Sequence, residues 1–376
     1  MIKTENPLKQ VLKFGQSLWY DGLISPKDFK NLIREDGIRG ATTNPTIFEK
    51  ALSTGEYDSR IRLGLAGGIP VEEIYKSLAV GAVQEVADVF QPVFKETEGH
   101  DGYVSIEVSP LLAYDTDATI REARELWGLV KRENVMIKVP ATRQGVPAIR
   151  ALIADGINVN VTLIFSIERY REVMNAYLEG LEDAFPPEAE KTGSFLSRTA
   201  SVASFFVSRV DTSVDALLEE KIALNSDAKK KAALKKLMGR AAVANSKLAY
   251  REFEAVFGSA RFKALEKKGA KKQRPLWAST GTKNPAYSDV VYVEALIGPE
   301  TVDTMPPATL DAFRDHGRPA SRVGSEIGES QKFLKDLEDE GIRLTEVTAL
   351  LEEAGVRSFS DSYQKILKGI ESKKKI

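Results

Sequence analysis

Short apolar segments recur along this chain, and stretches with the pattern of amphipathic helices separate most of them. The predicted strands lie near residues 18–24, 38–43, 102–108, 135–140, 157–164, 200–207, 274–280 and 300–305. Strands that alternate with helices favour a parallel sheet, and eight strands is the number that closes a (β/α)8 barrel. A chain of 376 residues is long for one domain but lies within the range of such barrels. The pattern therefore predicts an α/β fold with a single (β/α)8 TIM barrel.

Sparse polar residues within these strands support the same fold. In Val104–Val108 the polar residues are Ser105 and Glu107, which share one face because alternate side chains of a strand point to opposite sides. The segment Ile157–Leu163 likewise opposes four aliphatic residues with Asn158, Asn160 and Thr162. A half-exposed antiparallel sheet also alternates, but its polar face would favour Lys, Glu and Thr pairs. We therefore expect helices to cover an aliphatic outer face and the polar groups to converge inside a barrel.

Helical patterns occupy much of the remaining chain, near residues 71–97, 117–133, 166–183, 211–224, 228–257 and 309–316. A loop rich in proline and glycine, 186–193, precedes the sixth strand. After a glycine-containing linker at 317–328, three further helical patterns follow at 329–340, 344–354 and 360–373. We predict a barrel domain over residues 1–320 and a C-terminal helical extension over 321–376 that packs on it.

Lys138 is the most unusual residue of the predicted strands. It lies in Val135–Pro140, a run that is otherwise apolar and too short for a helix. Lysine is rarely buried without a partner, and burial favours its neutral amine, which is the form that attacks carbonyl groups. A lysine at the tip of a strand could instead extend its charge into solvent. The run alone favours neither interpretation.

Other reactive side chains fall near the carboxyl ends of the predicted strands, where (β/α)8 barrels carry out their chemistry. They are Asp21, Asn44, Glu107, Asn160 and Thr162. A lysine with two carboxylates and a hydroxyl fits Schiff-base catalysis, which needs an acid for the departing hydroxyl and a base for the sugar hydroxyl. Asp21 could instead cap the next helix or turn through Gly22.

The loops after the sixth and seventh predicted strands each combine a serine with a cation, Ser204 with Arg209 and Ser279 with Lys283. A serine and a cation after late barrel strands could together bind a phosphate. For Arg209 an ion pair on the helix surface with Asp211 or Asp215 is an equal alternative.

The composition argues against several other classes of protein. The formal net charge is −1, so we expect no nucleic-acid partner. The chain has no cysteine, and we expect its two histidines, His100 and His316, to be structural or solvated, so no metal site is predicted. We see no dinucleotide or P-loop motif and expect no cofactor. With no signal-peptide core and no apolar stretch that spans a bilayer, we expect a cytoplasmic protein without a membrane partner.

Taken together, five segments are similar to transaldolases of the longer bacterial subgroup, which belong to the class I Schiff-base aldolases. The segments are Gly40–Phe48, Val104–Val108, Ile137–Thr142, Asn158–Ser166 and Ser204–Asp211. The resemblance implies a barrel that is circularly permuted relative to other class I aldolases. It also implies transfer of a dihydroxyacetone unit from sedoheptulose 7-phosphate to glyceraldehyde 3-phosphate, which gives erythrose 4-phosphate and fructose 6-phosphate in the pentose phosphate pathway.

The same resemblance implies roles for individual residues. Lys138 is expected to be the Schiff-base lysine and Asp21 the acid and base for cleavage and formation of the C–C bond. A catalytic water is expected between Glu107 and Thr162. The residues expected to contact the substrate are Asn44 and Asn160 at its hydroxyls, Ser204 and Arg209 at its phosphate, and Phe206 as the adjacent wall.

One segment departs from the family pattern. Where many transaldolases have a second phosphate-binding arginine, this chain has Lys283 in the run Ala278–Asn284. Lysine keeps the charge but lacks the bidentate fork of arginine. We therefore expect Ser279 and Lys283 to contact phosphate with altered geometry.

Two other functions stay open, a fructose 6-phosphate aldolase that releases free dihydroxyacetone and a non-catalytic barrel that binds sugar phosphates. The fructose 6-phosphate aldolases that resemble this family have a glutamine in place of Glu107, which argues against the first. A lysine beside two acids argues against the second. We expect the protein to be a monomer or a homodimer.

Overall fold

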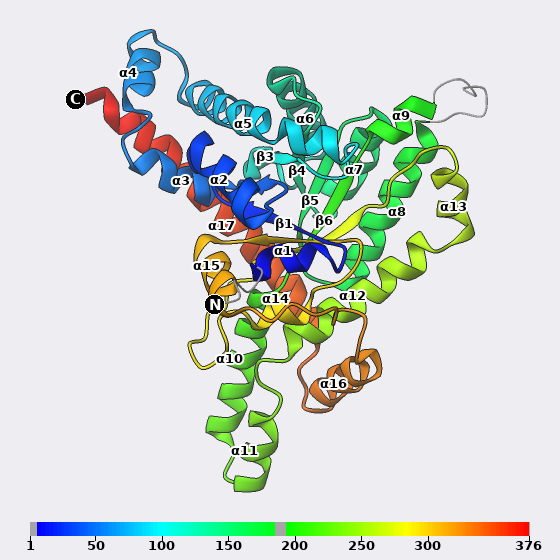
Figure 1. Cartoon of the computed structure of the whole chain (residues 1–376). Helices are drawn as coiled ribbons and strands as arrows, with labels where there is room; N and C mark the ends of the chain where they lie inside the picture. The colour runs from blue at the N-terminus through cyan, green and yellow to red at the C-terminus, as the bar shows by residue number, and fades with distance from the viewer. Residues whose placement is uncertain (1–5, 185–192, 376) are drawn as a thin grey trace, which may run out of the picture.

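Eight parallel strands close into a barrel in the order of the sequence, in a computed structural model that describes residues 6–184 and 193–375 (Figure 1). The strands are β1 (Gln16–Asp21), β2 (Ala41–Thr42), β3 (Val104–Glu107), β4 (Val135–Pro140), β5 (Val159–Ile164), β6 (Ser201–Phe206), β7 (Arg274–Ala278) and β8 (Thr301–Met305). β1 pairs with β8 over five residues and so closes the barrel. The predicted strands and the α/β barrel are confirmed.

Helices surround the barrel (Figure 1). The first half of the chain contributes α1 (Pro7–Leu12), α2 (Pro26–Asp36), α3 (Pro45–Ser53), α4 (Asp58–Ala66), α5 (Val71–Glu96), the 3-10 helix η1 (Pro110–Leu112), α6 (Thr116–Val130), α7 (Gly145–Ala154) and α8 (Ile167–Asp183). The second half contributes α9 (Gly193–Arg198), α10 (Ser208–Leu224), α11 (Ala228–Lys235), α12 (Ala241–Phe257), α13 (Ala260–Glu266), α14 (Val291–Ala295), α15 (Pro307–His316), α16 (Ile327–Asp339), α17 (Leu344–Ser372) and η2 (Lys373–Lys375).

Two helix predictions were wrong. The segment 228–257 is two helices, α11 and α12, because the chain turns at Gly239 with a φ of +69°. The segments 344–354 and 360–373 form the single helix α17, which continues through Gly355. Residues 186–192 of the predicted loop lie outside the described residues, as do residues 1–5 at the amino end, and Gly193 begins α9.

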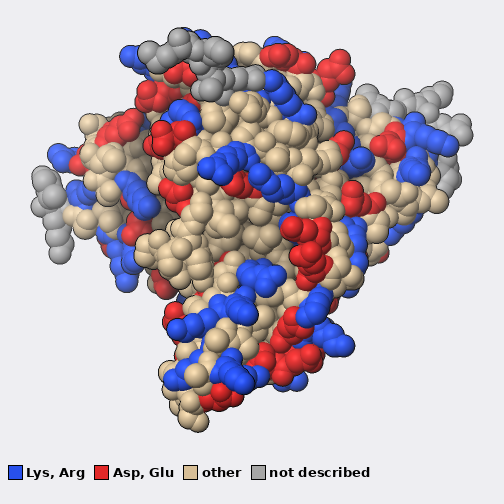
Figure 2. Space-filling model, turned by 60° about the horizontal axis from the view of Figure 1, so that its bottom comes forward, with Lys and Arg blue, Asp and Glu red and all other residues tan. Residues whose placement is uncertain are grey.

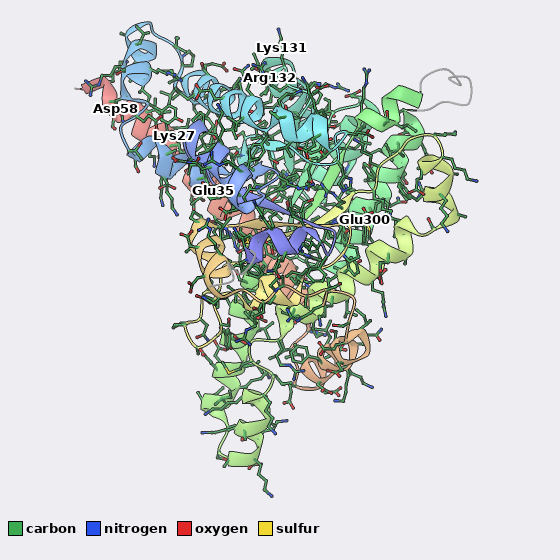
Figure 3. The ribbon with its side chains drawn as sticks, in the orientation of Figure 1. Lys27, Glu35, Asp58, Lys131, Arg132 and Glu300 are labelled. Atoms are coloured by element: carbon green, nitrogen blue, oxygen red, sulfur yellow. The ribbon has the colours of Figure 1, made fainter. Side chains whose placement is uncertain are left out.

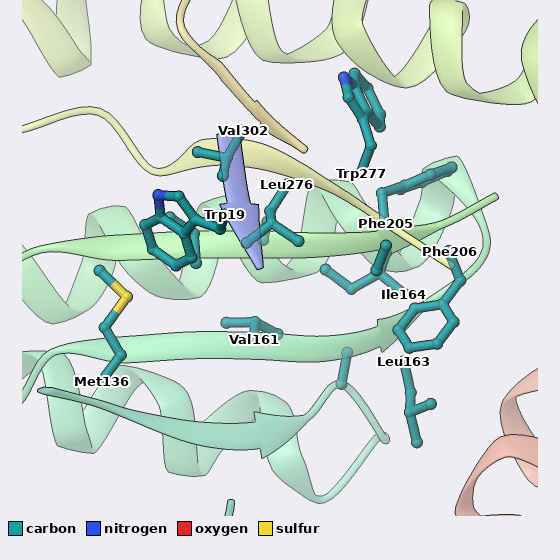
Figure 4. Packing of buried hydrophobic residues seen from close by; sticks show 14 of the residues in the cluster. Trp19, Met136, Val161, Leu163, Ile164, Phe205, Phe206, Leu276, Trp277 and Val302 are labelled. Carbon is teal, nitrogen blue, oxygen red and sulfur yellow. The ribbon is translucent and has the colours of Figure 1, made fainter. Parts of the chain in front are cut away.

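The two faces of each strand carry different side chains. Phe205 packs outward against Tyr170 of α8, with ring centroids 5.8 Å apart, and lies against Trp277 of β7 (Figure 4). The next residue, Phe206, contributes to the cavity at the carboxyl end of the barrel. This alternation buries the aliphatic and aromatic outer face beneath helices and leaves the inner face for polar groups.

Buried ionic contacts occupy the amino end of the barrel. Arg274 at the start of β7 lies 3.0 Å from Asp101, and both side chains are almost fully buried. Asp101 also accepts hydrogen bonds from Ser17 and Trp19 of β1. Arg274 donates to the backbone oxygen of His100, so this histidine belongs to a structural cluster. Charges placed out of water in this way require such partners, so the ionic groups at this end have a structural role.

Charged residues are spread over the outside of the molecule. Figure 2 shows both signs interspersed on the face it presents, in line with a formal net charge of −1. In Figure 3 Lys131 and Arg132 lie at the top of the view, and Arg132 pairs with Asp88 at 2.5 Å. Among the described residues, none of the helices is both long and apolar enough to cross a membrane.

Candidate active site

A cavity of about 270 Å³ lies at the carboxyl end of the strands and gathers most of the predicted site residues. Those that line it are Asp21, Asn44, Lys138, Ser204, Phe206, Arg209, Ser279 and Lys283. Glu107, Asn160 and Thr162 do not line it, but the first two contact residues that do, Lys138 and Ser204. Residues from distant parts of the sequence are therefore brought together at the end of the barrel where such folds carry out chemistry.

A larger cavity, about 830 Å³, lies near the amino ends of β4 to β6, with Glu133, Asn158 and Thr199 in its wall. None of the predicted site residues lines it. Volume alone does not identify an active site, and we assign greater weight to the convergence of reactive groups in the smaller cavity.

Lys138 is buried in the inner wall of β4, with 5% of its surface exposed. Its Nζ atom donates a hydrogen bond of 3.1 Å to the backbone oxygen of Thr43 and lies 3.6 Å from Oε2 of Glu107. The alternative in which this lysine extends its charge into solvent is therefore wrong. The amine is held at the cavity by Thr43, which directly follows β2, and by Glu107 at the end of β3.

Glu107 faces Lys138 from the end of β3, in register with it across the two strands. Burial raises the pKa of Glu107 to about 7, although the positive charge of Lys138 acts to lower it. Its Oε2 atom and Oγ1 of Thr162 are buried and have no hydrogen-bond partner among the described residues. Because buried polar atoms are nearly always paired, these two oxygens suit a small polar group bound in the protein interior.

Asp21 ends β1 at the edge of the cavity. Its Oδ1 atom accepts a 2.7 Å hydrogen bond from Oγ1 of Thr42, which orients the carboxylate. Burial raises the pKa of Asp21, whereas the charge of Lys138 and the bond from Thr42 act to lower it. The following helix is capped by Ser25, whose side chain accepts from the backbone of Asp28. The alternative role of Asp21 as a helix cap is therefore wrong.

Two amide side chains hold neighbouring groups in place. Asn160 lies fully buried beneath the cavity, where its Oδ1 accepts from Ser204 at 2.7 Å and its Nδ2 donates to Ser105 at 2.9 Å. Asn44 lines the cavity, and its Oδ1 caps α3 by accepting from the backbone of Ile47 at 3.0 Å. This cap leaves the Nδ2 group of Asn44 as a hydrogen-bond donor for a ligand.

Arg209, at the start of α10, provides a cation in the wall of the cavity. Its guanidinium lies 5.3 Å from the ring centre of Phe206, and burial lowers its pKa. In the part of the chain that the structure describes, no carboxylate pairs with it. Asp211 instead accepts hydrogen bonds from Ala242 and Tyr292, and Asp215 from Gly239 and Tyr287. The alternative of a surface ion pair is wrong, and the charge of Arg209 faces the cavity.

Ser279 and Lys283 complete this side of the wall, with the Ser279 hydroxyl 3.0 Å from that of Ser208. The cavity wall holds four cations, Lys50, Lys138, Arg209 and Lys283, against one carboxylate, Asp21, and this excess of positive charge suits an anionic ligand such as a phosphate.

The cavity also has lining residues that the sequence pattern did not identify, among them Thr42, Thr46, Lys50, Thr304 and Phe359. Thr46 and Lys50 lie one turn apart on α3, which follows the cap at Asn44, so helical spacing was a usable signal for them. Phe359 belongs to α17, and nothing in the local sequence connects it with the barrel. Within the described residues, no group of three or more histidine, aspartate or glutamate side chains could hold a metal ion.

Comparisons with known proteins agree with this geometry. A family model described as "Transaldolase/Fructose-6-phosphate aldolase" matches residues 18–370. The chain is 45% identical to a protein named "Transaldolase" from Trichodesmium erythraeum, with 98% of each chain covered. Proteins of the same name from Saccharopolyspora erythraea, 45% identical over 98% of each chain, and Mycolicibacterium smegmatis, 47% identical over 96% of each chain, are also similar.

Proposed function

The chain belongs to the transaldolase/fructose-6-phosphate aldolase family and is an enzyme with transaldolase activity, and we propose that it acts through an imine on Lys138. Transaldolase activity belongs to the pentose phosphate pathway. In the reaction we propose, a dihydroxyacetone unit passes from sedoheptulose 7-phosphate to glyceraldehyde 3-phosphate and leaves erythrose 4-phosphate and fructose 6-phosphate.

The observation that carries the proposal is the contact between a buried lysine and a buried carboxylate, 3.6 Å apart, in a cavity that also holds Asp21. The amine of Lys138 adds to the C2 carbonyl of the ketose, and the resulting carbinolamine loses water to form a protonated imine. Asp21 then takes the proton from the C4 hydroxyl, the C3–C4 bond breaks, and its electron pair moves into the imine to give an enamine. The enamine then reacts with the acceptor aldehyde, and the same steps run in reverse to give the new ketose.

Glu107 and Thr162 have a separate task in this proposal. We propose that they bind one water, for which both offer a buried oxygen without a hydrogen bond among the described residues, and use it to move protons during formation and hydrolysis of the imine. A glutamate whose pKa is about 7 can both accept and release a proton at neutral pH.

The other lining residues bind the substrate. We propose that Arg209 and Lys283 neutralise its phosphate, with Ser204 and Ser279 as hydroxyl partners, since both cations face the cavity. Asn44 is proposed to orient the hydroxyl groups of the sugar directly, Asn160 to do so from beneath the cavity through Ser204, and Phe206 to form the adjacent wall. Lys50 on α3 adds positive charge at the same cavity.

Glu107→Gln is expected to slow imine formation by on the order of 10²-fold, since an amide cannot relay a proton. The ionised carboxylate of Glu107 is the base. Because the pKa of Glu107 is about 7, this form is lost by protonation as the pH falls through that value. The rate of imine formation in the parent should therefore decline below neutral pH, and the variant, whose amide at position 107 does not titrate, should lack this inflection. Stopped-flow measurements at several pH values follow both effects. An unchanged rate and profile would show that Glu107 has no such role.

The family model covers two activities, transfer and simple aldol cleavage, which an acceptor aldehyde distinguishes. With fructose 6-phosphate alone, we expect release of about one equivalent of glyceraldehyde 3-phosphate per active site, after which the enamine waits for an acceptor. Addition of erythrose 4-phosphate should restore continuous turnover. If free dihydroxyacetone formed continuously at a similar rate without an acceptor, the protein would be a fructose 6-phosphate aldolase instead.

The organisation of the chain is part of the proposal. We propose a barrel domain at residues 1–320 and an extension at 321–376, supported by the contacts of α17 with α3, α5, α10 and η1. We also propose that the protein is a monomer or a homodimer. We propose a cytoplasmic location because a chain without cysteine needs no oxidising compartment.

A further inference from the structure

The C-terminal helix α17 lies across the elements that surround the candidate active site. It packs against α3, η1 and α10, and it contacts the end of β5 (Figure 1, red). α3 carries three residues of the cavity wall, Thr46, Ile47 and Lys50, and β5 carries Thr162. A helix from the last part of the chain therefore belongs to the same structural unit as the catalytic groups.

One residue of α17, Phe359, reaches the cavity itself. Its side chain lines the wall and is 3% exposed. Nζ of Lys138 lies 5.8 Å from the centre of its ring, within the range of cation–π interactions. The ring is thus the apolar group of the extension that lies over the nucleophilic amine.

Several contacts hold α17 at this position. The hydroxyl of Ser362 lies 3.1 Å from that of Thr46, and Tyr363 packs edge-on against Tyr75 of α5 at 5.3 Å. One turn before Phe359, the backbone of Gly355 approaches β5 so closely that a Cβ atom there would lie 2.9 Å from the side chain of Leu163.

Leu163 lies near the end of β5 (Figure 4). It follows Thr162 at an irregularity in the pairing of β5 and β6, and its φ of +59° is unusual for this residue. The end of β5 is therefore shaped to receive the helix beside a predicted catalytic hydroxyl.

We infer that Phe359 is a specificity-determining residue of the active site, which shields the enamine on Lys138 from water and so favours transfer over release. The inference rests on the proposed imine at Lys138. Loss of the intermediate requires protonation of the enamine carbon and then attack of water on the iminium, which frees dihydroxyacetone and returns the amine. A ring over the nitrogen excludes water from one side of the intermediate, and its π face stabilises the positive charge of the iminium.

The inference is tested by the ratio of free dihydroxyacetone released to ketose formed by transfer, measured on the full chain with fructose 6-phosphate and erythrose 4-phosphate. In Phe359→Ala this ratio is expected to rise by about tenfold or more, because water gains access to the enamine. Phe359→Leu, which keeps apolar bulk, should restore a ratio near that of the parent. If the alanine variant does not fold, Phe359→Val gives the same test with a smaller rise.

The matched control is Ile366→Ala, which removes a buried side chain two turns further along the same helix and outside the cavity wall. It should leave the ratio unchanged. An unchanged ratio in Phe359→Ala would overturn the inference. An equal rise in Ile366→Ala would also overturn it, because loosening of α17 would then explain the effect.

A separate measurement keeps the premise distinct from the inference. Borohydride should still trap the substrate on Lys138 in Phe359→Ala, as in the parent. If the parent itself gave no adduct at Lys138, the proposed function would fail, and with it the role of the ring. If the parent gave the adduct and the ratio did not respond to Phe359, only the inference would fail.

Discussion

Lys138→Arg is expected to abolish transaldolase activity, with a loss of roughly 10⁴-fold or more, while the protein stays folded. Arginine keeps the positive charge opposite Glu107, which lies 3.6 Å from the lysine in the parent. A guanidinium remains protonated in proteins and cannot add to a carbonyl group. The measurement is the rate of transfer from fructose 6-phosphate to erythrose 4-phosphate.

The matched control is a second buried lysine. Lys247 of α12 is 4% exposed and lies 2.8 Å from Glu326, outside the candidate active site. Lys247→Arg should retain most of the activity of the parent. A Lys138→Arg enzyme with activity near that of the parent would contradict the assignment of the nucleophile.

Asp21→Ala is expected to separate imine formation from C–C cleavage. Lys138 is intact in this variant, so fructose 6-phosphate should still form the imine. Without the carboxylate that takes the C4 proton, cleavage should slow by about 10²-fold to about 10⁴-fold. The covalent adduct should therefore accumulate and become visible by intact mass spectrometry.

A structural role for Asp21 predicts a different outcome. Its carboxylate accepts a hydrogen bond from Thr42, so loss of this contact alone would lower the melting temperature and slow both steps alike. Asp303→Asn is a suitable control, because Asp303 is a fully buried carboxylate, bound by Thr280, outside the cavity wall. The catalytic role of Asp21 would be excluded if Asp21→Ala were destabilised and formed no adduct while Asp303→Asn stayed active.

The barrel could be predicted from the sequence because the strands alternate so regularly. In β3 and β5 the inner positions are polar and the outer ones aliphatic, and this period of two survives any small error in the strand ends. The strand ends then indicated the site, since parallel strands bring their carboxyl ends to the same edge of a barrel. Lys138 and Glu107 were predicted in this way and are neighbours in register.

Residues that reach the site through tertiary packing could not be predicted from a local pattern. Phe359 looks like any other apolar position on the buried face of α17, and only the docking of that helix brings its ring to Lys138. The break between α11 and α12 depends on a backbone turn at Gly239, whereas Gly355 lies inside a continuous helix. Glycine alone does not show which of these two outcomes applies, because the packing around it decides.

Reductive trapping tests most directly whether Lys138 carries the substrate as an imine. The protein is incubated with fructose 6-phosphate, reduced with borohydride, digested and mapped by mass spectrometry. We predict one modified peptide, in which Lys138 bears a reduced dihydroxyacetone unit or the reduced ketose. Modification of a different lysine, or no modification under conditions in which the enzyme turns over, would contradict this account.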